Sequence, residues 1–171
     1  LHDALPISSI GYKVIGIDSS SSAVELCRSA ANKFGIDASF KVFDISEDKI
    51  AINKLVDALI EDKPSKVNIY SRFFIHAIDE EAENKFFYLI NRLKSFVDVK
   101  VFLEFRTVRD QSLPKETSTH YRRFVHPEII VAKVIQSNMK LSYHIEGFGY
   151  AKYKSDEAYV ARMIFISENN D

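Results

Sequence analysis

The sequence has little cysteine and no long apolar run, and both features limit what the protein can be. Its only cysteine is Cys27, so an intramolecular disulfide is excluded and a reducing, cytoplasmic location is expected. No apolar stretch approaches the roughly 18 residues that span a bilayer. The formal net charge of −1 supplies no overall field that favours nucleic acid or an anionic membrane. We therefore expect neither as a partner, and the sequence leaves the oligomeric state open.

The overall amino-acid composition is that of an ordinary globular domain. The 171 residues are 46% hydrophobic and 27% charged, which suits one domain with a real core. The first eight residues, LHDALPIS, fit no element that the following residues require. We interpret residues 1–8 as a non-native or disordered leader, with a native disordered terminus as the alternative, and residues 9–171 as the domain.

From Tyr12 onward, apolar runs of strand type alternate with segments of helical periodicity. Serine hydroxyls at residues 20–22 can cap the first helix, whose apolar face includes Leu26 and Phe34, and Gly35 can end it. Ser46 is expected to cap the second helix, and Asp79 the third, whose buried stripe extends to Phe96. The expected strands are Tyr12–Asp18, Ser39–Ile45, Lys66–Ile75 and Val99–Phe105, and the last helix runs from Pro127 to about Met139.

Two further strands end the chain, at Ser142–Tyr153 and Tyr159–Ser167. The connection at Lys154–Asp156 is too short for a parallel crossover, so this pair must be antiparallel. The predicted fold class is α/β: a doubly wound, Rossmann-like, mostly parallel sheet that ends in an antiparallel strand pair. In such a fold, the loops that bind ligands lie at the carboxyl edge of the strands.

Acidic residues end the first two strands. In VIGIDSSSSAVELC, Asp18 directly precedes a helix and can accept hydrogen bonds from vicinal ribose hydroxyls, or it can simply be a capping residue. In KVFDIS, Asp44 can accept from an adenine amine while Ile45 packs against the ring, or it can be a turn or N-cap residue. Together the two acids describe one side of a nucleoside pocket.

With its antiparallel ending, this pattern resembles the class I S-adenosylmethionine-dependent methyltransferases from Ile10 to about Ser167. The resemblance implies S-adenosylmethionine as cofactor, with Asp18 beside its ribose and Asp44 beside its adenine. We assign Ser19, Ile45 and Ser71 to the same cofactor site. The activity implied is methyl transfer to a small acceptor, such as a sugar or a phosphorylated metabolite.

Glycine is scarce at the place where the family needs it. The family begins with a strand and a glycine-rich loop, yet none of the five glycines forms such a loop. We expect the chain to be truncated, with the first, central strand absent between Tyr12–Asp18 and Lys66–Ile75. The glycines are Gly11, Gly16, Gly35, Gly147 and Gly149.

The motif YSRFFIHAI, Tyr70–Ile78, resembles the fourth-strand motif of a small-molecule branch of the family, where the strand end faces the transferred methyl group. We assign catalytic roles to His76, as a base for a hydroxyl acceptor, and to Arg72. The alternatives are a packed histidine and an ion pair between Arg72 and an acid such as Glu104. A metal site is not expected, because the spacing around the other histidines is wrong.

A basic segment follows the fourth strand. Between residues 106 and 123, five basic side chains face two acidic ones in a nearly neutral chain. Because Thr107–Val125 is a long aperiodic loop, we predict a mobile lid that grips an anionic acceptor. The alternative is a solvated loop paired with the acidic helix start at Glu80–Glu83. The residues assigned to acceptor binding are Arg106, Arg109, Tyr121, Arg122 and Arg123.

Two other functions remain open. A nicotinamide-dependent oxidoreductase would use Asp18 equally well, but it predicts continuing parallel strands at the end of the chain. The chain could also be a non-catalytic fragment or binding module that holds no cofactor.

Overall fold

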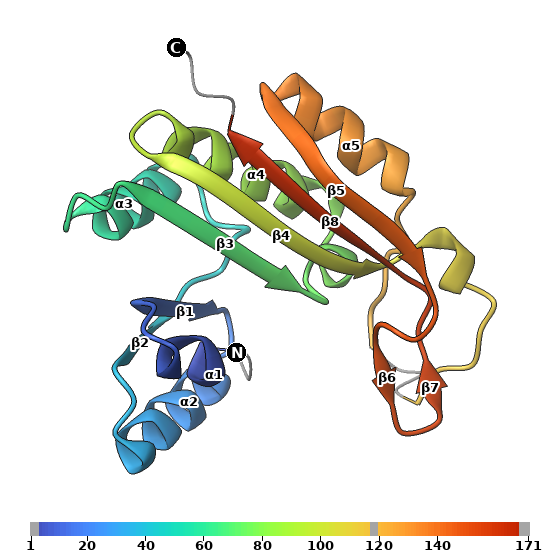
Figure 1. Cartoon of the computed structure of the whole chain (residues 1–171), viewed down its shortest axis with the longest axis horizontal. Coiled ribbons are helices and arrows are strands. Elements are labelled where there is room, and N and C mark those ends of the chain that lie inside the picture. Colours follow the sequence, from blue (N-terminus) through green and yellow to red (C-terminus); the bar gives the residue numbers. More distant parts are fainter. Residues whose placement is uncertain (1–3, 117–119, 168–171) are drawn as a thin grey trace. The chain divides into compact units, whose positions relative to one another are not determined.

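The computed structural model describes residues 4–116 and 120–167, and the chain divides into two compact units between residues 47 and 48 (Figure 1). Each unit has its own sheet and its own core. Their elements are given in turn.

The first unit is a strand–helix–strand module preceded by a short helix. Strand β1 (Val14–Asp18) pairs with β2 (Ala38–Val42) in parallel, with Asp18 opposite Val42. Helix α2 (Ser21–Phe34) begins at Ser20, whose hydroxyl accepts from the N–H of Ala23 at 3.2 Å. It ends at Gly35, whose φ of 62° is the left-handed conformation that glycine adopts without strain. These caps and strands confirm the prediction for this region.

The core of the first unit is small. Val24, Ala31 and Phe40 are buried, and Cys27 packs against them. Leu26 and Phe34, which we predicted on the buried face of α2, are instead 72% and 66% exposed. With only two strands beside it, α2 has too little sheet surface in this unit to cover its whole apolar face.

Part of the expected leader is helical. Helix α1 covers Ala4–Ser9, and the hydroxyl of Ser8 donates to the carbonyl of Asp37 at 2.6 Å. Residues 1–3 lie outside the described residues. The helix differs from the disordered terminus that was one interpretation of residues 1–8, and their non-native origin stays a prediction.

The second unit is built on a four-stranded sheet of order β3–β4–β8–β5. Strands β3 and β4 are parallel, and β8 is antiparallel to both of its neighbours, β4 and β5. The strands are β3 (Lys66–Arg72), β4 (Asp98–Arg106), β5 (Met139–Gly147) and β8 (Val160–Ser167). The antiparallel ending is confirmed, because the last long strand inserts between β4 and β5.

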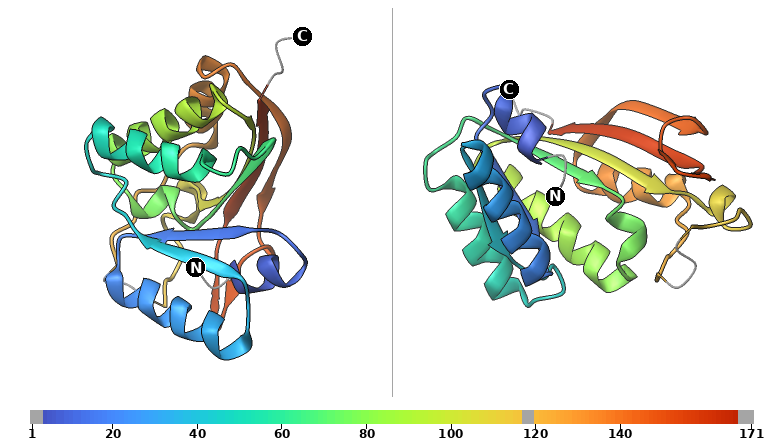
Figure 2. Two further views of the ribbon diagram at one scale, coloured as in Figure 1. Left: turned by 90° about the vertical axis from the view of Figure 1, so that its left-hand side faces the viewer. Right: turned by 90° about the horizontal axis from the view of Figure 1, so that it is seen from below.

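Three helices lie on one face of this sheet (Figures 1 and 2). Strand residues that alternate toward the helices, such as Val99, Val101 and Leu103, are buried. Residues between them on β4 point to the opposite face, which no helix of this unit covers. The helices are α3 (Lys49–Ile60), α4 (Glu80–Lys94) and α5 (Pro127–Gln136), and the short elements are η1 (Ile75–Ala77), η2 (Val108–Asp110), β6 (Lys152–Tyr153) and β7 (Asp156–Glu157).

Several predicted boundaries in this unit are wrong. Helix α3 is capped by Asp48, which accepts from the N–H of Ala51 at 2.8 Å, and not by Ser46. Strand β3 ends at Arg72, because Phe73 has a φ of 55° and breaks the extended backbone. Phe96 lies beyond α4 and is exposed. The segment predicted as one strand, Ser142–Tyr153, is β5 followed by half of the small β6–β7 hairpin.

Among the described residues, β1 pairs only with β2, and the four-stranded sheet begins at β3. The two strands predicted to flank an absent central strand are thus not paired with each other. The α/β class, the parallel strands and the reversed ending agree with the predicted fold.

Candidate functional site

Two carboxylates lie at one edge of the β1–β2 sheet. Asp18 accepts the N–H of Ser20 at 2.9 Å, and Asp44 accepts the N–H of Ser46 at 2.8 Å. Each acid is therefore fixed by the backbone two residues further on, through one of its two oxygens. The N–H of Phe43 continues the sheet by donating to the carbonyl of Asp18 at 2.9 Å. The structure thus brings the two acids to the same carboxyl edge, as predicted.

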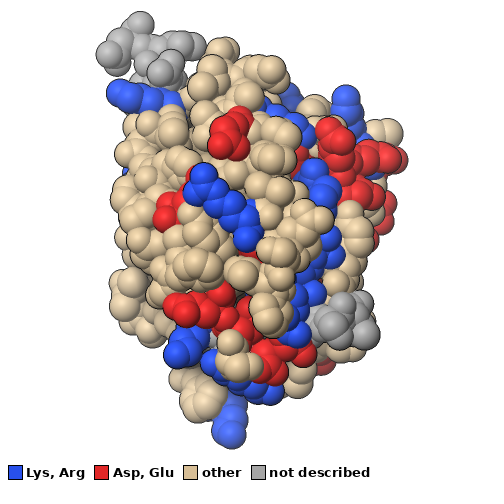
Figure 3. Space-filling view, turned by 90° about the vertical axis from the view of Figure 1, so that its right-hand side faces the viewer, with Lys and Arg blue, Asp and Glu red and all other residues tan. Residues whose placement is uncertain are grey.

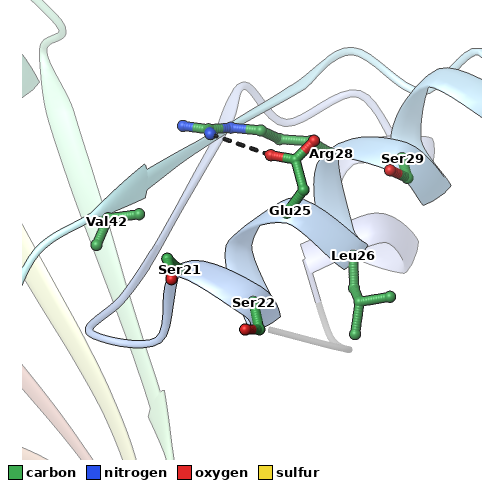
Figure 4. Close-up of a pocket in the computed structure, with 7 residues that line it drawn as sticks. All are labelled: Ser21, Ser22, Glu25, Leu26, Arg28, Ser29 and Val42. Carbon is green, nitrogen blue, oxygen red and sulfur yellow. Dashed lines mark ion pairs between the residues drawn. The ribbon is translucent and has the colours of Figure 1, made fainter.

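The neighbours of these acids are accessible. Ser19 is exposed, and Ile45 is half-buried beside Asp44. A hollow lies nearby between α2 and the end of β2, where it is lined by polar side chains of α2, by Leu26 and by Val42 (Figure 4). Its only charged pair is Glu25 and Arg28, 3.5 Å apart. Since neither Asp18 nor Asp44 lines it, the hollow is a weaker candidate than the strand ends.

In the second unit, the end of β3 holds a buried hydroxyl with no partner. Ser71 is on the helix-covered face, and its Oγ makes no hydrogen bond within the described structure. An unsatisfied buried polar group costs about 1–3 kcal/mol. A ligand group that reached the carboxyl end of this strand could supply the missing hydrogen bond to the Ser71 hydroxyl.

His76 lies just beyond Ser71, in η1, and is buried. Its Nδ1 accepts the backbone N–H of Arg106 at 3.1 Å. Burial, together with the positive charges of Arg106 and Arg122, lowers the pKa of His76 from 6.5 to about 4. The ring is therefore neutral at neutral pH, and because Nδ1 is the acceptor, the proton is on Nε2. In this tautomer, Nε2 is a hydrogen-bond donor, so the geometry does not favour the predicted role as a base.

Arg72 is in the ion pair that was the alternative to its catalytic role. Its Nε donates to one oxygen of the buried Glu104 at 2.6 Å. The Nε of Arg162, on the other side, donates to the second oxygen at 2.6 Å. Glu104 and Arg162 were not among the predicted site residues. The signal that could have identified Arg162 is a charged residue in the otherwise apolar last strand.

The structure corrects the placement of Arg106, which we expected in an exposed lid. It ends β4, is buried, and donates to Asp110 and Asp156, each at 2.7 Å. Burial opposes its charge, but these two hydrogen bonds raise the pKa of Arg106 further. The same contact with Arg106 lowers the pKa of Asp156 despite its burial. This guanidinium is thus neutralised inside the unit.

The other basic residues of the segment also have protein partners. Arg123 pairs with the buried Glu83, which confirms the alternative of pairing with the acidic helix start. Arg109 donates to the hydroxyl of Tyr159 at 2.8 Å, and Arg122 to the carbonyl of His120 at 3.3 Å. Tyr121 is exposed. Acidic side chains are interspersed with the basic ones over this side of the molecule (Figure 3).

The segment is anchored near both ends. Thr107 bridges to Val125, and the N–H of Arg123 donates to the carbonyl of His76 at 2.8 Å. Residues 117–119 of the expected lid lie outside the described residues. These contacts favour a tethered loop over a mobile lid.

Among the described residues, no helix is long and apolar enough to cross a membrane, and no group of three or more potential ligands is placed to hold a metal ion.

No protein-family model matches the chain, and no curated protein matches its sequence. Several solved structures match the chain in fold. The magnesium protoporphyrin IX methyltransferase of Synechocystis is 14% identical, with a TM-score of 0.64 over 96% of this chain and 68% of that one. A methyltransferase of Methanosarcina mazei is 15% identical, with a TM-score of 0.66 over 95% and 85%. A glycopeptide N-methyltransferase complexed with S-adenosylmethionine is 13% identical, with a TM-score of 0.62 over 95% and 75%.

The chain therefore has the Rossmann-like fold of S-adenosylmethionine-dependent methyltransferases, and the predicted resemblance is confirmed at the level of the fold.

Proposed function

We propose that the protein is part of an S-adenosylmethionine-dependent methyltransferase that transfers a methyl group to a small acceptor molecule. The observation that carries the proposal is the pair Asp18 and Asp44, at the ends of two neighbouring parallel strands within a chain of methyltransferase fold. Each carboxylate has its orientation fixed by its own turn. Asp18 would accept from the two ribose hydroxyls, and Asp44 would lie beside the adenine.

The residues present fit the nucleoside half of the cofactor. Ile45 is half-buried next to Asp44, where it can pack against a purine ring, and Ser19 is exposed beside Asp18. Ser71, in the second unit, has an unsatisfied hydroxyl at a strand end, and its assignment to the cofactor site stays a prediction. For the methionine half, the described residues contain no glycine-rich loop after a strand. The residues that would bind the methionine half are therefore not identified among those assigned to the site.

Bound S-adenosylmethionine would supply a methyl group already activated on its sulfonium sulfur. The protein then mainly holds the acceptor in line and excludes water. With its proton on Nε2, His76 would orient an acceptor oxygen by donating a hydrogen bond. An acceptor that is already deprotonated, such as a carboxylate, suits this arrangement better than a hydroxyl, because one oxygen can accept from His76 while the other attacks the methyl group.

The competing oxidoreductase is less well supported. It shares the use of Asp18, but it predicts further parallel strands, whereas β8 is antiparallel to both of its neighbours. Calorimetric titration with S-adenosylhomocysteine, S-adenosylmethionine and oxidised nicotinamide adenine dinucleotide separates the functions. We expect binding of the first two and none of the third.

The variant Asp18→Ala tests the residue that carries the proposal. We expect its affinity for S-adenosylhomocysteine to fall by about 1.5–3 kcal/mol, the contribution of a charged acceptor, and that of Asp18→Asn by somewhat less. Asp37→Ala is the matched control, because Asp37 is an exposed aspartate that precedes β2 at the opposite edge of the same sheet. Unchanged affinity in Asp18→Ala, or preferential binding of the dinucleotide, would contradict the proposal.

A further inference from the structure

We infer that Asp156 and Phe73 are positioning residues for His76. Asp156, in the β6–β7 hairpin, acts through Arg106, whose side chain it binds and whose backbone N–H binds the His76 ring. Phe73, in the turn after β3, acts through direct contact of its ring with that of His76. The role of His76 toward an acceptor rests on the proposed function, whereas its positioning can be measured on the ring itself.

The His76 ring takes the place of a strand residue at the end of β4. The parallel pairing of β3 and β4 ends with the N–H of Phe73, which donates to the carbonyl of Glu104 at 2.8 Å. In a continuing parallel ladder, the carbonyl of Phe73 would accept the N–H of Arg106. That N–H donates instead to Nδ1 of His76 at 3.1 Å. The orientation of the ring therefore depends on where the backbone of Arg106 lies.

Phe73 is held in an unfavourable backbone conformation by the base of the β6–β7 hairpin. Its φ of 55° lies in the left-handed region, which a residue with a bulky side chain adopts only when its surroundings hold it there. The surroundings are a small cluster of Ala151, Ala158 and Val160, all buried, against which Phe73 packs. The N–H of Ala158 donates to the carbonyl of Ala151 at 3.3 Å and closes this base. The hairpin thus stabilises the turn that leads from β3 to His76.

The ring of Phe73 contacts both His76 and Arg106. Its centre lies 5.3 Å from the centre of the His76 ring, and the planes meet at 78°, which is the favoured edge-to-face arrangement of aromatic rings. The guanidinium carbon of Arg106 lies 5.9 Å from the Phe73 ring centre, within the range of a cation–π contact. A displacement of Phe73 would therefore affect the imidazole and also the residue whose N–H the imidazole accepts.

Asp156 fixes the side chain of Arg106 from the hairpin. The guanidinium donates to Asp156 and to Asp110, each at 2.7 Å, and both carboxylates are buried. Charge-assisted hydrogen bonds between buried groups hold a side chain in one orientation. Asp110 also accepts the N–H of Tyr159 and pairs with Lys115, so its loss would disturb more than Arg106. Asp156 is therefore the better residue to vary.

These contacts decide which ring nitrogen of His76 is a donor. While Nδ1 accepts the N–H of Arg106, the proton of the neutral ring is on Nε2. A ring released from Arg106 would populate both neutral tautomers, and Nε2 would be a donor for only part of the time. The ion pair of Asp156 and the packing of Phe73 thus keep His76 in the form that the proposed function uses.

The test is nitrogen-15 NMR of the full chain with labelled histidine at neutral pH. The His76 signals are those that the variant His76→Asn lacks. In the wild type we expect well-separated Nδ1 and Nε2 shifts, with the proton on Nε2. In Asp156→Asn and in Phe73→Leu, which nearly keep the volume of the side chain, the two shifts should converge. Mixed tautomers in the wild type would overturn the inference, and an unchanged separation in either variant would overturn the role of that residue.

The pKa of His76 distinguishes positioning from a simple effect of charge. Burial and the charges of Arg106 and Arg122 lower this pKa to about 4, and the charge of Asp110 raises it. Asp156→Asn removes a negative charge, which by itself would lower the pKa of His76 further. Release of the ring toward water acts in the opposite direction, so we expect a rise to about 5 or higher. A fall would mean that Asp156 acts through its charge alone and would overturn its positioning role.

Two further variants control for charge and for folding. Glu157→Gln removes the same charge one position further along β7, where the side chain is exposed, and should leave the ring signals unchanged. An equal response in Glu157→Gln would mean a diffuse effect of the hairpin charge and would overturn the inference. Asp156→Glu keeps a carboxylate beside Arg106, and ring signals like those of the wild type would support the ion pair as the cause.

Titration of the same samples with S-adenosylhomocysteine distinguishes this inference from the proposed function. Binding of S-adenosylhomocysteine, with no response of the His76 ring to either variant, contradicts only the positioning roles. A response of the ring as expected, without binding of S-adenosylhomocysteine, contradicts the proposed function while the positioning roles stand.

Discussion

The two units of the chain differ in how their carboxylate side chains are buried and paired. In the first unit, Asp18 and Asp44 lie at strand ends, where each accepts a backbone N–H of its own turn. In the second, carboxylates such as Glu83 and Asp110 are fully buried and hold two cationic side chains each. An exposed, oriented carboxylate is suited to a ligand, whereas a buried one with paired cations holds loops and strands together. The difference separates candidate site residues from structural ones.

The largest expected effect is the loss of a buried carboxylate in the second unit. Asp110 accepts from Arg106 at 2.7 Å, from the N–H of Tyr159 at 2.7 Å, and lies 3.2 Å from Lys115. Asp110→Ala removes the carboxylate that these three donors share and should lower the free energy of unfolding in urea by about 3–5 kcal/mol. Glu81→Ala, which removes an exposed pair with Lys85, should lower it by less than about 1 kcal/mol. Similar losses in the two variants would remove the proposed distinction between structural and exposed carboxylates.

The second effect depends on pH. Because the pKa of His76 is lowered to about 4 in the folded protein, the unfolded chain binds a proton between about pH 6.5 and pH 4 that the folded chain does not. Stability should therefore fall as the pH decreases through this range, by about 2 kcal/mol between pH 7 and pH 5.

Urea unfolding at a series of pH values measures this slope. His76→Asn supplies an amide oxygen in place of Nδ1 but does not titrate, so its stability should lose this dependence. A wild-type slope that persists in the variant would assign the effect to other groups.

A smaller effect compares two polar residues just before α3. Asp48→Ala removes the N-cap of α3 and should cost about 1 kcal/mol of stability. Ser46→Ala should cost less, because the N-cap hydrogen bond of α3 is accepted by Asp48 and not by Ser46. Thermal unfolding of both variants measures the difference, and a larger loss in Ser46→Ala would support the cap expected from the sequence.

The smallest effect returns to the first unit. Leu26→Ser should leave the hydrogen-exchange protection of β1 and β2 almost unchanged, because Leu26 is exposed. Val24→Ala, on the buried side of the same helix, should reduce it by about 1–2 kcal/mol through lost apolar burial. Equal loss in both would mean that the outer face of α2 is covered in solution.

The local predictions that succeeded rest on short-range physics. Gly35 ends a helix because its backbone tolerates a positive φ, and Asp18 ends a strand because the N-cap of the next helix, Ser20, follows two residues later. By contrast, the cap of α3 was misplaced by two residues, since Ser46 and Asp48 are equally good caps in sequence. Only the first turn of the actual helix decides between them.

The order of strands and helices, the antiparallel ending and the two acids at the ends of neighbouring strands followed from the sequence alone, because periodicity, turn residues and connection lengths are properties of neighbouring residues. The sequence alone did not predict which charged side chains are buried. Arg106, Arg109 and Arg123 look alike in a basic segment, but one is enclosed by two carboxylates, one contacts a tyrosine hydroxyl, and one pairs with Glu83. Arg72, Glu104 and Arg162, up to 90 positions apart, are brought together through strand register, which only the tertiary structure sets.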